Sequence, residues 1–235
     1  MEKNEYLDVS AEFVGAAALF ASNDDRGGTF CHVNIIPGPV GGAIIWALDG
    51  HHAFFIHEED GVVTEPVQIR HHKDLLKACG CKVDAPKKRL QAEHELEYIR
   101  VASFDKKDGE QFIDFNPAPA HRARDMINYK SFVEKFAVSI PGVRAKSING
   151  NTYALMRKLF KDEYKYHPIL HQSSDESGEG PVFHTFSDVP NMLVTTMPVK
   201  VFENCDGKGV PQPGDSYADF LNIASTLVSS PFAEG

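Results

Sequence analysis

The sequence has 235 residues, 42% of them hydrophobic, which suffices for one large or two small domains whose core needs no disulfides. No apolar run approaches the roughly 18 residues that span a bilayer, and Met1 to Glu5 lacks the order of a secretory signal, so a cytoplasmic protein is expected. The formal net charge of -9 argues against a protein that coats nucleic acid with its whole surface, but it allows a local basic face. The four cysteines are scattered, and Cys79 and Cys81 are too close together for a CxxC pair, so reduced structural thiols are expected.

The first 64 residues predict a strand, a helix and then three strands. Short β-branched runs bounded by turn residues indicate strands, and Ser10 stands where a helix N-cap is expected. Asp49-Gly50 predicts a hairpin with a two-residue type I′ turn, because glycine tolerates the positive φ that this turn requires. The predicted elements are a strand at 6–9, a helix at 11–21 and strands at 30–36, 43–48 and 52–57.

The same order of elements recurs twice further along the chain. The second unit has a strand at 66–69, a helix at 71–78 closed by Gly80, and strands near 90–94, 96–102 and 111–115. The third has a strand at 143–148, a helix at 151–160, and strands at 166–172, 182–186 and 192–202. Prolines interrupt residues 116–146, where a short helix at 130–136 is the clearest element. Repeated units of this kind predict an α+β fold with antiparallel sheets and helices on one face.

The tail at 204–235 has a different composition. Glycines and prolines at 207–214 indicate a flexible link, and a Ser216-x-x-Asp219 capping box then precedes an apolar stripe at helical spacing. The stripe consists of Tyr217, Phe220, Leu221, Ala224 and Val228. The segment 216–228 is therefore predicted to be a docking helix, either on this chain or on a partner.

Three motifs, in this order and spacing, resemble those of the bacterial sliding clamp, the β subunit of the replicative DNA polymerase. Leu48-Asp49-Gly50-His51-His52-Ala53 is similar to the family's Thr-Asp-Gly-His-Arg-Leu turn. Phe112-Ile113-Asp114-Phe115, followed by Pro119-Ala120-His121-Arg122, is similar to Leu-Ile-Asp-Gly-x-Phe-Pro-Asp-Tyr-Arg, with one residue inserted and Phe115 in place of glycine. Thr196-Met197-Pro198-Val199-Lys200-Val201 is similar to the closing Met-Pro-Met-Arg-Leu.

The resemblance covers about residues 6–203 and implies a shortened DNA-clamp-like fold. A clamp of that family has three domains of two units each, whereas this chain is expected to have a complete two-unit domain at 1–118 and a shortened second domain at 119–203. The link and helix at 204–235 follow. The length is closer to that of the two-domain clamps of phages and eukaryotes, whereas the motifs resemble the bacterial type. A phage-encoded or otherwise divergent clamp-like protein fits this mixture best.

The resemblance also implies two sites, neither of which needs a cofactor or a metal. Basic residues on channel-lining helices would meet the phosphates of double-stranded DNA without reading its sequence, and the candidates are Arg26, Lys73, Lys77, Arg157, Lys158 and Lys161. A cleft for short peptides of polymerase and other replication proteins would comprise Gly50, His51, His52, Pro119, Arg122, Met197, Pro198 and Lys200. The tail helix at 216–228 is placed in or near this cleft as a hypothesis. The alternatives are that the basic residues are ordinary solvated helix faces, that Asp49-Gly50 is a plain hairpin turn, and that Met197-Pro198 belongs to an edge strand.

The resemblance predicts a processivity factor or a peptide-docking platform, acting as a homo-oligomer, and not an enzyme. A monomeric clamp mimic and a phage protein of unrelated function are the alternatives. The pairs His51-His52 and His71-His72 and the acids at 58–60 also raise the alternative of a histidine-rich metal-dependent hydrolase. Adjacent histidines on a strand point to opposite faces, however, and the sequence has no HExxH, Walker, GxGxxG or GxSxG motif.

Overall fold

A computed structural model describes most of the first half of the chain and the third predicted unit. The described residues are 5–23, 30–93, 99–105, 109–115, 136, 139–141, 148, 150–162, 166–172 and 180–197. Within them no helix is long and apolar enough to cross a membrane. The expected helix at 130–136 (apart from Phe136), the expected strand at 143–148 (apart from residue 148) and the whole tail at 204–235 lie outside these ranges.

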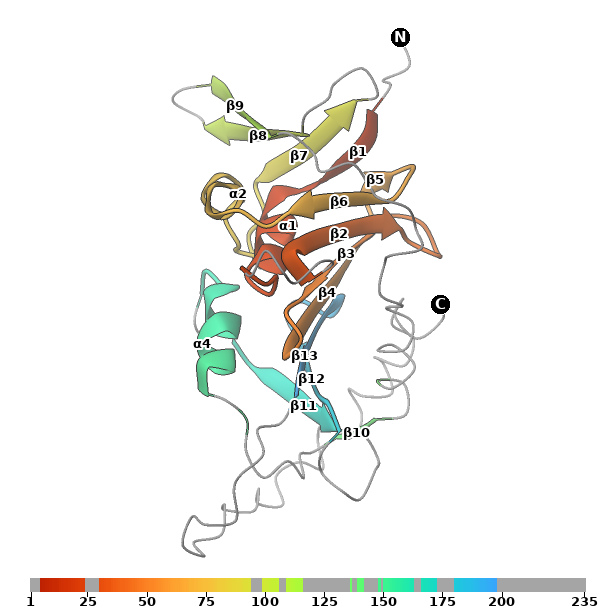
Figure 1. Ribbon diagram of the computed structural model, residues 1–235, viewed down its shortest axis with the longest axis vertical. Coiled ribbons are helices and arrows are strands. Elements are labelled where there is room, and N and C mark those ends of the chain that lie inside the picture. The colour runs from red at the N-terminus through yellow and green to blue at the C-terminus, as the bar shows by residue number, and fades with distance from the viewer. Residues whose placement is uncertain are drawn as a thin grey trace, which may run out of the picture.

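The elements follow one another as repeats of a strand, a helix and a three-strand meander (Figure 1). The first unit contains β1 (Glu5–Ser10), α1 (Ala11–Ala18), β2 (His32–Pro37), β3 (Ala43–Leu48) and β4 (His52–Glu58). After the short β5 (Val62–Val63), the second contains β6 (Val67–Arg70), α2 (Lys73–Cys79), β7 (Lys88–Glu93), β8 (Ile99–Asp105) and β9 (Gly109–Phe115). The third contains β10 (Ile140–Pro141), α4 (Gly150–Lys158), β11 (Pro168–Gln172), β12 (Val182–Phe186) and β13 (Met192–Thr196).

The first two units exchange their first strands. β1 pairs with β7 of the second unit, and β6 pairs with β2 of the first, both antiparallel. The result is a five-stranded sheet, β5-β1-β7-β8-β9, and an eight-stranded sheet, β10-β11-β12-β13-β4-β3-β2-β6. The last strands of the first and third units, β4 and β13, pair at the centre of the larger sheet, which therefore runs through both units.

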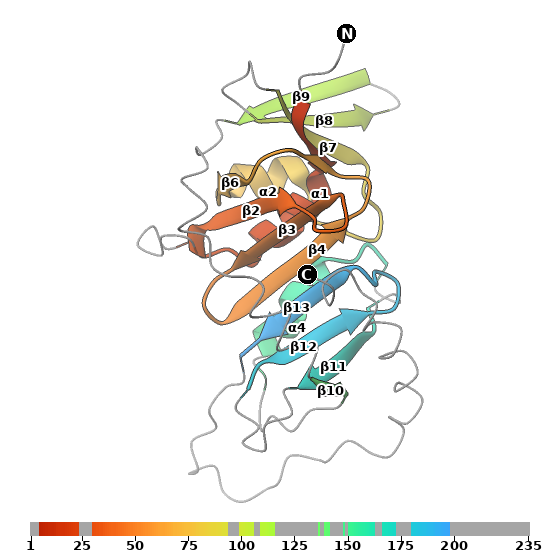
Figure 2. The same cartoon turned by 90° about the vertical axis from the view of Figure 1, so that its right-hand side faces the viewer.

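The three helices α1, α2 and α4 lie on the same side of the eight-stranded sheet (Figure 1). Figure 2, turned by 90°, shows the opposite face of that sheet in front of the helices. We call these the helix face and the outer face. On β3 and β4 every residue but His52 is buried, because both faces of the sheet are covered there.

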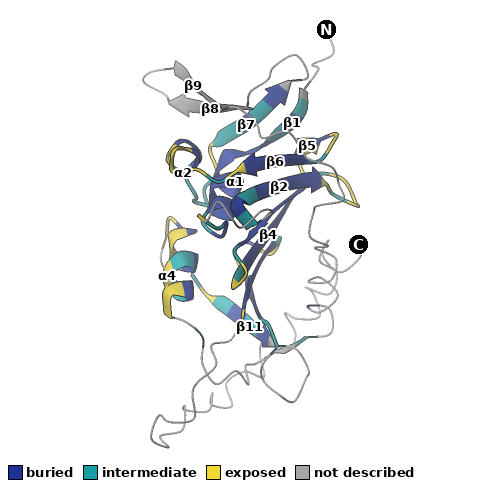
Figure 3. Cartoon of the chain, viewed as in Figure 1, coloured by how far each residue is buried: buried dark blue, intermediate teal, exposed yellow. Residues whose placement is uncertain are grey.

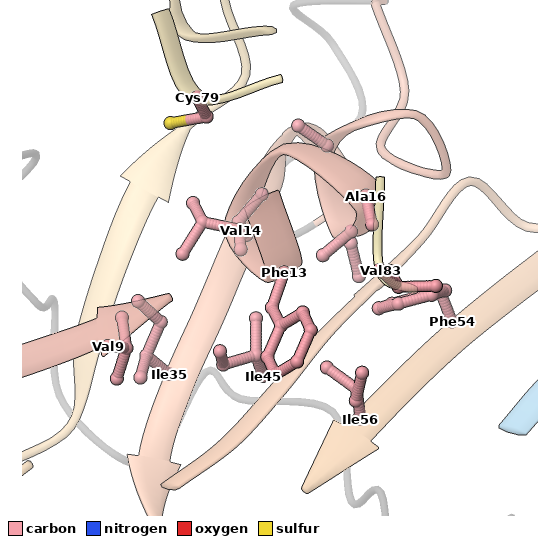
Figure 4. Close-up of a cluster of buried hydrophobic side chains, with 14 of the residues drawn as sticks. Val9, Phe13, Val14, Ala16, Ile35, Ile45, Phe54, Ile56, Cys79 and Val83 are labelled. Carbon is pink, nitrogen blue, oxygen red and sulfur yellow. The ribbon is translucent and has the colours of Figure 1, made fainter. Parts of the chain in front are cut away.

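The main core lies between the two sheets and around α1, all eight residues of which are buried. Phe13 of α1 points toward Ile45 and Ile56 of the larger sheet, and Val9 of the smaller sheet lies beside Ile35 of the larger one (Figure 4). Gly15 brings α1 against α2, since a Cβ built at Gly15 would lie 1.7 Å from the Gly80 carbonyl oxygen. The α1–α2 contact therefore requires a residue without a side chain at position 15.

Two local predictions differ from the structure at the ends of α1. Ser10 occupies the N-cap position, but its hydroxyl makes no capping bond; it donates instead to Glu58 Oε1 at 2.6 Å. The helix ends at Ala18, three residues before the predicted end, because the following residues continue as single turns whose N–H groups bond to Ala17 and Ala18.

The predicted hairpin joins β3 to β4, but its two central residues are Gly50 and His51 and not Asp49 and Gly50. Gly50 takes a φ of 93°, and the Asp49 N–H donates to the His52 carbonyl oxygen at 3.1 Å. The backbone N–H groups of His51 and His52 donate to Asp49 Oδ1 at 2.8 and 2.7 Å. The aspartate side chain thus closes this turn, as Asx turns do.

Candidate nucleic-acid interface and peptide site

Five of the six predicted DNA-facing cations are described, and all five are exposed. Lys73 and Lys77 are on α2, Arg157 and Lys158 end α4, and Lys161 follows it. α2 and α4 turn exposed surfaces away from the sheets, whereas α1 is buried throughout (Figure 3). Arg26 lies outside the described residues. The structure therefore places exposed basic residues on two helices on the same side of the larger sheet.

The loop after α2 holds the C-terminal end of α4. Lys82 Nζ donates to the carbonyl oxygens of Lys158 and Phe160 at 2.7 and 2.8 Å, and the Val83 N–H donates to the Leu159 oxygen at 2.8 Å. A lysine at a helix C-terminus satisfies carbonyls that have no partner within the helix. The loop thereby fixes the basic end of α4 relative to α2.

Asp84, in the same loop, accepts hydrogen bonds from the residues that follow α4. Its Oδ1 accepts from the Lys161 N–H at 2.8 Å, and its Oδ2 accepts from the Asp162 N–H at 3.2 Å. Sequence reasoning missed Lys82 and Asp84, since their partners lie 76 to 78 residues away and no local pattern marks such a bond.

The N-terminal end of α4 is held by the β3–β4 turn. His52 Nδ1 lies 2.9 Å from Asp49 Oδ2, and His52 Nε2 lies 2.9 Å from Thr152 Oγ1 in the first turn of α4. Because a carboxylate only accepts, Nδ1 carries the proton and the Thr152 hydroxyl donates to Nε2 when the ring is neutral. Thr152 is fully buried, so this Asp-His-Thr chain holds the helix and presents no accessible nucleophile.

The bonds of this turn favour the ionised form of Asp49. Burial opposes ionisation, but bonds from the His52 side chain and from the His51 and His52 N–H groups outweigh it and lower the pKa of Asp49. The acceptor of this turn therefore stays charged at a lower pH than an ordinary aspartate does.

The end of β13 lies beside this turn. Thr196 is opposite His52 in the β13–β4 ladder, and the Met197 N–H donates to the His51 carbonyl oxygen at 2.8 Å. Met197 is 43% exposed, and Gly50 and His51 are also exposed. The structure thus brings together four of the predicted cleft residues, Gly50, His51, His52 and Met197. Pro119, Arg122, Pro198 and Lys200 lie outside the described residues.

His184 of β12 is buried beneath α4 and gives the fold a pH dependence. Its Nε2 lies 3.1 Å from Thr196 Oγ1, its ring meets the Tyr153 ring edge-on, and burial lowers its pKa to about 3. The unfolded chain takes up a proton near pH 6.5 and the folded chain does not, so stability falls as pH drops below 6.5.

We expect His184 to contribute a loss of roughly 2 kcal/mol in the free energy of unfolding between pH 6.5 and pH 5. His184→Leu should remove that part of the pH dependence, measured by denaturant unfolding at both pH values. His167→Leu is the control, because His167 is exposed. An equal pH dependence in wild type and His184→Leu would contradict this account.

One of the three acidic residues that suggested a metal site, Glu58, is used inside the protein. Glu58 is buried and accepts from Arg89 Nη1 at 2.7 Å, and it also accepts from the N–H and hydroxyl of Ser10. In the part of the chain that the structure describes, no group of three or more His, Cys, Asp and Glu side chains could hold a metal ion. Cys79 is also buried, which raises its thiol pKa to about 12.

These elements define a DNA-clamp fold: antiparallel sheets built from repeated strand, helix and three-strand units, with the helices on one face of the sheet that joins the units. No protein-family model and no curated protein matches the sequence. Solved structures of bacterial sliding clamps do match the fold, which confirms the fold class expected from the three motifs.

Three of these structures have a TM-score of 0.52. The chain is 8% identical to the β chain of DNA polymerase III from Streptococcus pneumoniae and 9% identical to the DNA polymerase sliding clamp from Bacillus subtilis, and in both cases 89% of this chain covers 68% of the other. It is 13% identical to the sliding clamp from Bartonella birtlesii bound to griselimycin, where 86% of this chain covers 68% of the other. At these identities the likeness is one of fold.

Proposed function

We propose that this protein is a clamp-like DNA replication protein that binds double-stranded DNA without sequence preference along α2 and α4. The observation that carries the proposal is the placement of Lys73, Lys77, Arg157, Lys158 and Lys161 on exposed positions of one side of a clamp fold. Lysine and arginine contacts to phosphates supply sequence-independent affinity, and the net charge of -9 disfavours DNA elsewhere on the surface. The role is one of binding, not catalysis.

We further propose that copies of the chain close around DNA and act as a processivity factor. An oligomer that encloses DNA should remain on a nicked circular duplex and leave when the circle is linearised. Light scattering of the free protein should give a multiple of 26.0 kDa. A monomer that is not retained on circles but binds replication proteins would indicate the monomeric clamp mimic, and a monomer that does neither would indicate a phage protein of unrelated function.

Peptide docking at the β3–β4 turn is a second proposed function. It is supported by the exposed thioether of Met197 beside Gly50 and His51, because an exposed apolar side chain next to a rigid turn suits the apolar groups of a short peptide. Polymerase and other replication proteins that carry clamp-binding peptides are the proposed partners.

Met197→Glu should weaken peptide binding at this site at least tenfold. Met197 is 43% exposed, so covering it contributes somewhat under half of the about 1.5–3 kcal/mol of a fully buried methionine. The cost of removing water from the glutamate charge adds to this loss, and a tenfold change in affinity corresponds to about 1.4 kcal/mol. Griselimycin, which is bound to the Bartonella birtlesii clamp, is the probe, and calorimetry is the measurement. Val40→Glu is the matched control, since Val40 is also exposed, at 59%, but lies in the β2–β3 loop. Equal affinities of the two variants would exclude Met197 from the site.

A further inference from the structure

The outer face of the eight-stranded sheet is buried across almost its whole width. One row of residues, each directly opposite the next in the ladder, crosses seven strands from β6 to β11 on this face. The row consists of Gln68, Asn34, Trp46, Phe55, Leu193, Thr185 and Ile169, and none of them is more than 5% exposed. A face that bordered solvent would not show such values, so a second layer covers it.

The described residues account for only part of this layer. The helices lie on the other face, and the apolar cluster of the outer face includes, besides strand residues, Phe136 and the partly buried Phe30. Phe136 packs on Phe183 of β12 and His171 of β11, with ring centroids 5.4 and 5.5 Å away. Trp46 lies three strands from Phe183, which at about 4.8 Å per strand is roughly 14 Å, beyond the reach of one phenyl ring.

The central part of the row is its most apolar part. Trp46 and Phe55 are opposite each other and stack with ring centroids 6.2 Å apart, and Leu193 is opposite Phe55. What covers them must therefore present several apolar side chains along one line. An amphipathic helix does so with a stripe of residues at spacings of three and four.

We propose that residues 216–228 form a helix of this chain that packs on the outer face over Trp46 and Phe55. The described chain ends at Met197, which is bonded to the turn at the edge of that face, and 18 residues separate it from residue 216. A link of that length can reach any point of the sheet. The 13-residue helix that follows it would be about 20 Å long. The stripe of Tyr217, Phe220, Leu221, Ala224 and Val228 supplies the apolar side chains, and Asp219 is the only charged residue of the segment.

This placement differs from the peptide-cleft position considered for the tail, and it makes the tail a structural layer. The outer face needs such a layer because Trp46 and Phe55 would otherwise form part of a large exposed apolar patch, a feature that promotes association in solution. The tail would then keep this face of the sheet from binding a second sheet or another protein.

Trp46 is the only tryptophan of the chain, so its fluorescence reports directly on this face. In the full-length protein, Phe220→Asp with Leu221→Asp should shift the Trp46 emission to longer wavelength and raise its acrylamide quenching constant severalfold. Asn222→Asp with Thr226→Asp adds the same charge to the opposite side of the predicted helix and should leave both quantities unchanged.

Circular dichroism and denaturant unfolding establish that each variant is folded. A second variant pair, Tyr217→Asp against Ser225→Asp, repeats the comparison with single substitutions if the double variant does not fold. Unchanged Trp46 emission in folded Phe220 and Tyr217 variants would overturn the proposal and assign the cover to residues 116–135. Emission of the wild type that shifts on dilution would overturn it in favour of a second copy of the chain.

Discussion

Replacing Gly15 by alanine is expected to destabilise the protein by about 3 kcal/mol or more. The new Cβ would lie 1.7 Å from the Gly80 carbonyl oxygen, which is backbone and cannot rotate away. α1 and α2 would have to separate, and Gly80, with a φ of 75°, would have to move with the end of α2. Overpacking of a core costs about 1–3 kcal/mol, and a contact this short with backbone belongs at or beyond the upper limit.

The control is Gly150→Ala at the first residue of α4, where an added Cβ meets nothing within 4 Å. That variant should be neutral or slightly more stable, because alanine is the better helix former. Denaturant unfolding monitored by circular dichroism gives both free energies. Equal stabilities of the two variants would show that α1 and α2 do not pack through Gly15.

Arg89→Ala should lower the free energy of unfolding by about 3 kcal/mol. This is close to the lower end of the range of about 3–5 kcal/mol for breaking a buried ion pair. The guanidinium joins the two sheets: Nε donates to Asp8 Oδ1 of the smaller sheet and Nη1 donates to Glu58 Oε1 of the larger one, both at 2.7 Å. The Glu58 side chain is 7% exposed, so its charge would lose its counterion without gaining water. The Arg89 side chain is itself 29% exposed, which places the effect at the lower end.

Lys87→Ala is the matched control because it removes a neighbouring positive charge from an exposed position. It should change the free energy of unfolding by less than about 0.5 kcal/mol. The combination of Arg89→Met with Glu58→Gln should be more stable than Arg89→Met alone, since the buried charge of Glu58 is then removed and only the more exposed Asp8 is left without its partner. A loss below about 1 kcal/mol in Arg89→Ala would show that the two sheets do not depend on this ion pair.

Local patterns in the sequence predicted the order of the described elements except the two-residue strands β5 and β10. Short apolar runs and turn residues predicted β3 and β12 at their observed bounds and β4 to within one residue, and Gly80 ends α2 as predicted. The exchange of β1 and β6 between the two sheets could not be predicted in this way, because alternation along a strand shows which residues are buried but not which strand is the neighbour.

The same distinction holds for the candidate sites: local motifs could be recognised in the sequence, but the long-range partners of their residues could not. Asp49-Gly50-His51-His52 was recognisable as a turn from its letters, yet the bond from His52 to Thr152 joins residues 100 positions apart. Glu58 looked like part of a metal site by its neighbours in sequence, whereas its partner Arg89 is 31 residues away on another sheet. The sequence identified each basic residue of α2 and α4 as a candidate DNA contact. It did not identify Lys82 and Asp84, which fix one helix relative to the other, because no pattern near them in the sequence marks these bonds.

The salt dependence of duplex DNA binding tests the central claim most directly. The affinity of wild type for a duplex of arbitrary sequence should fall linearly with the logarithm of salt concentration, and the slope should become shallower by about 0.9 for each phosphate that a variant no longer neutralises. Lys73→Glu on α2 and Lys158→Glu on α4 should each weaken binding and reduce the slope. Val40→Glu with Thr64→Glu brings the same change in net charge to the β2–β3 and β5–β6 loops, away from α2 and α4, and should keep the wild-type slope (Figure 1). Equal slopes in all three variants, or no duplex binding by wild type at low salt, would contradict the account.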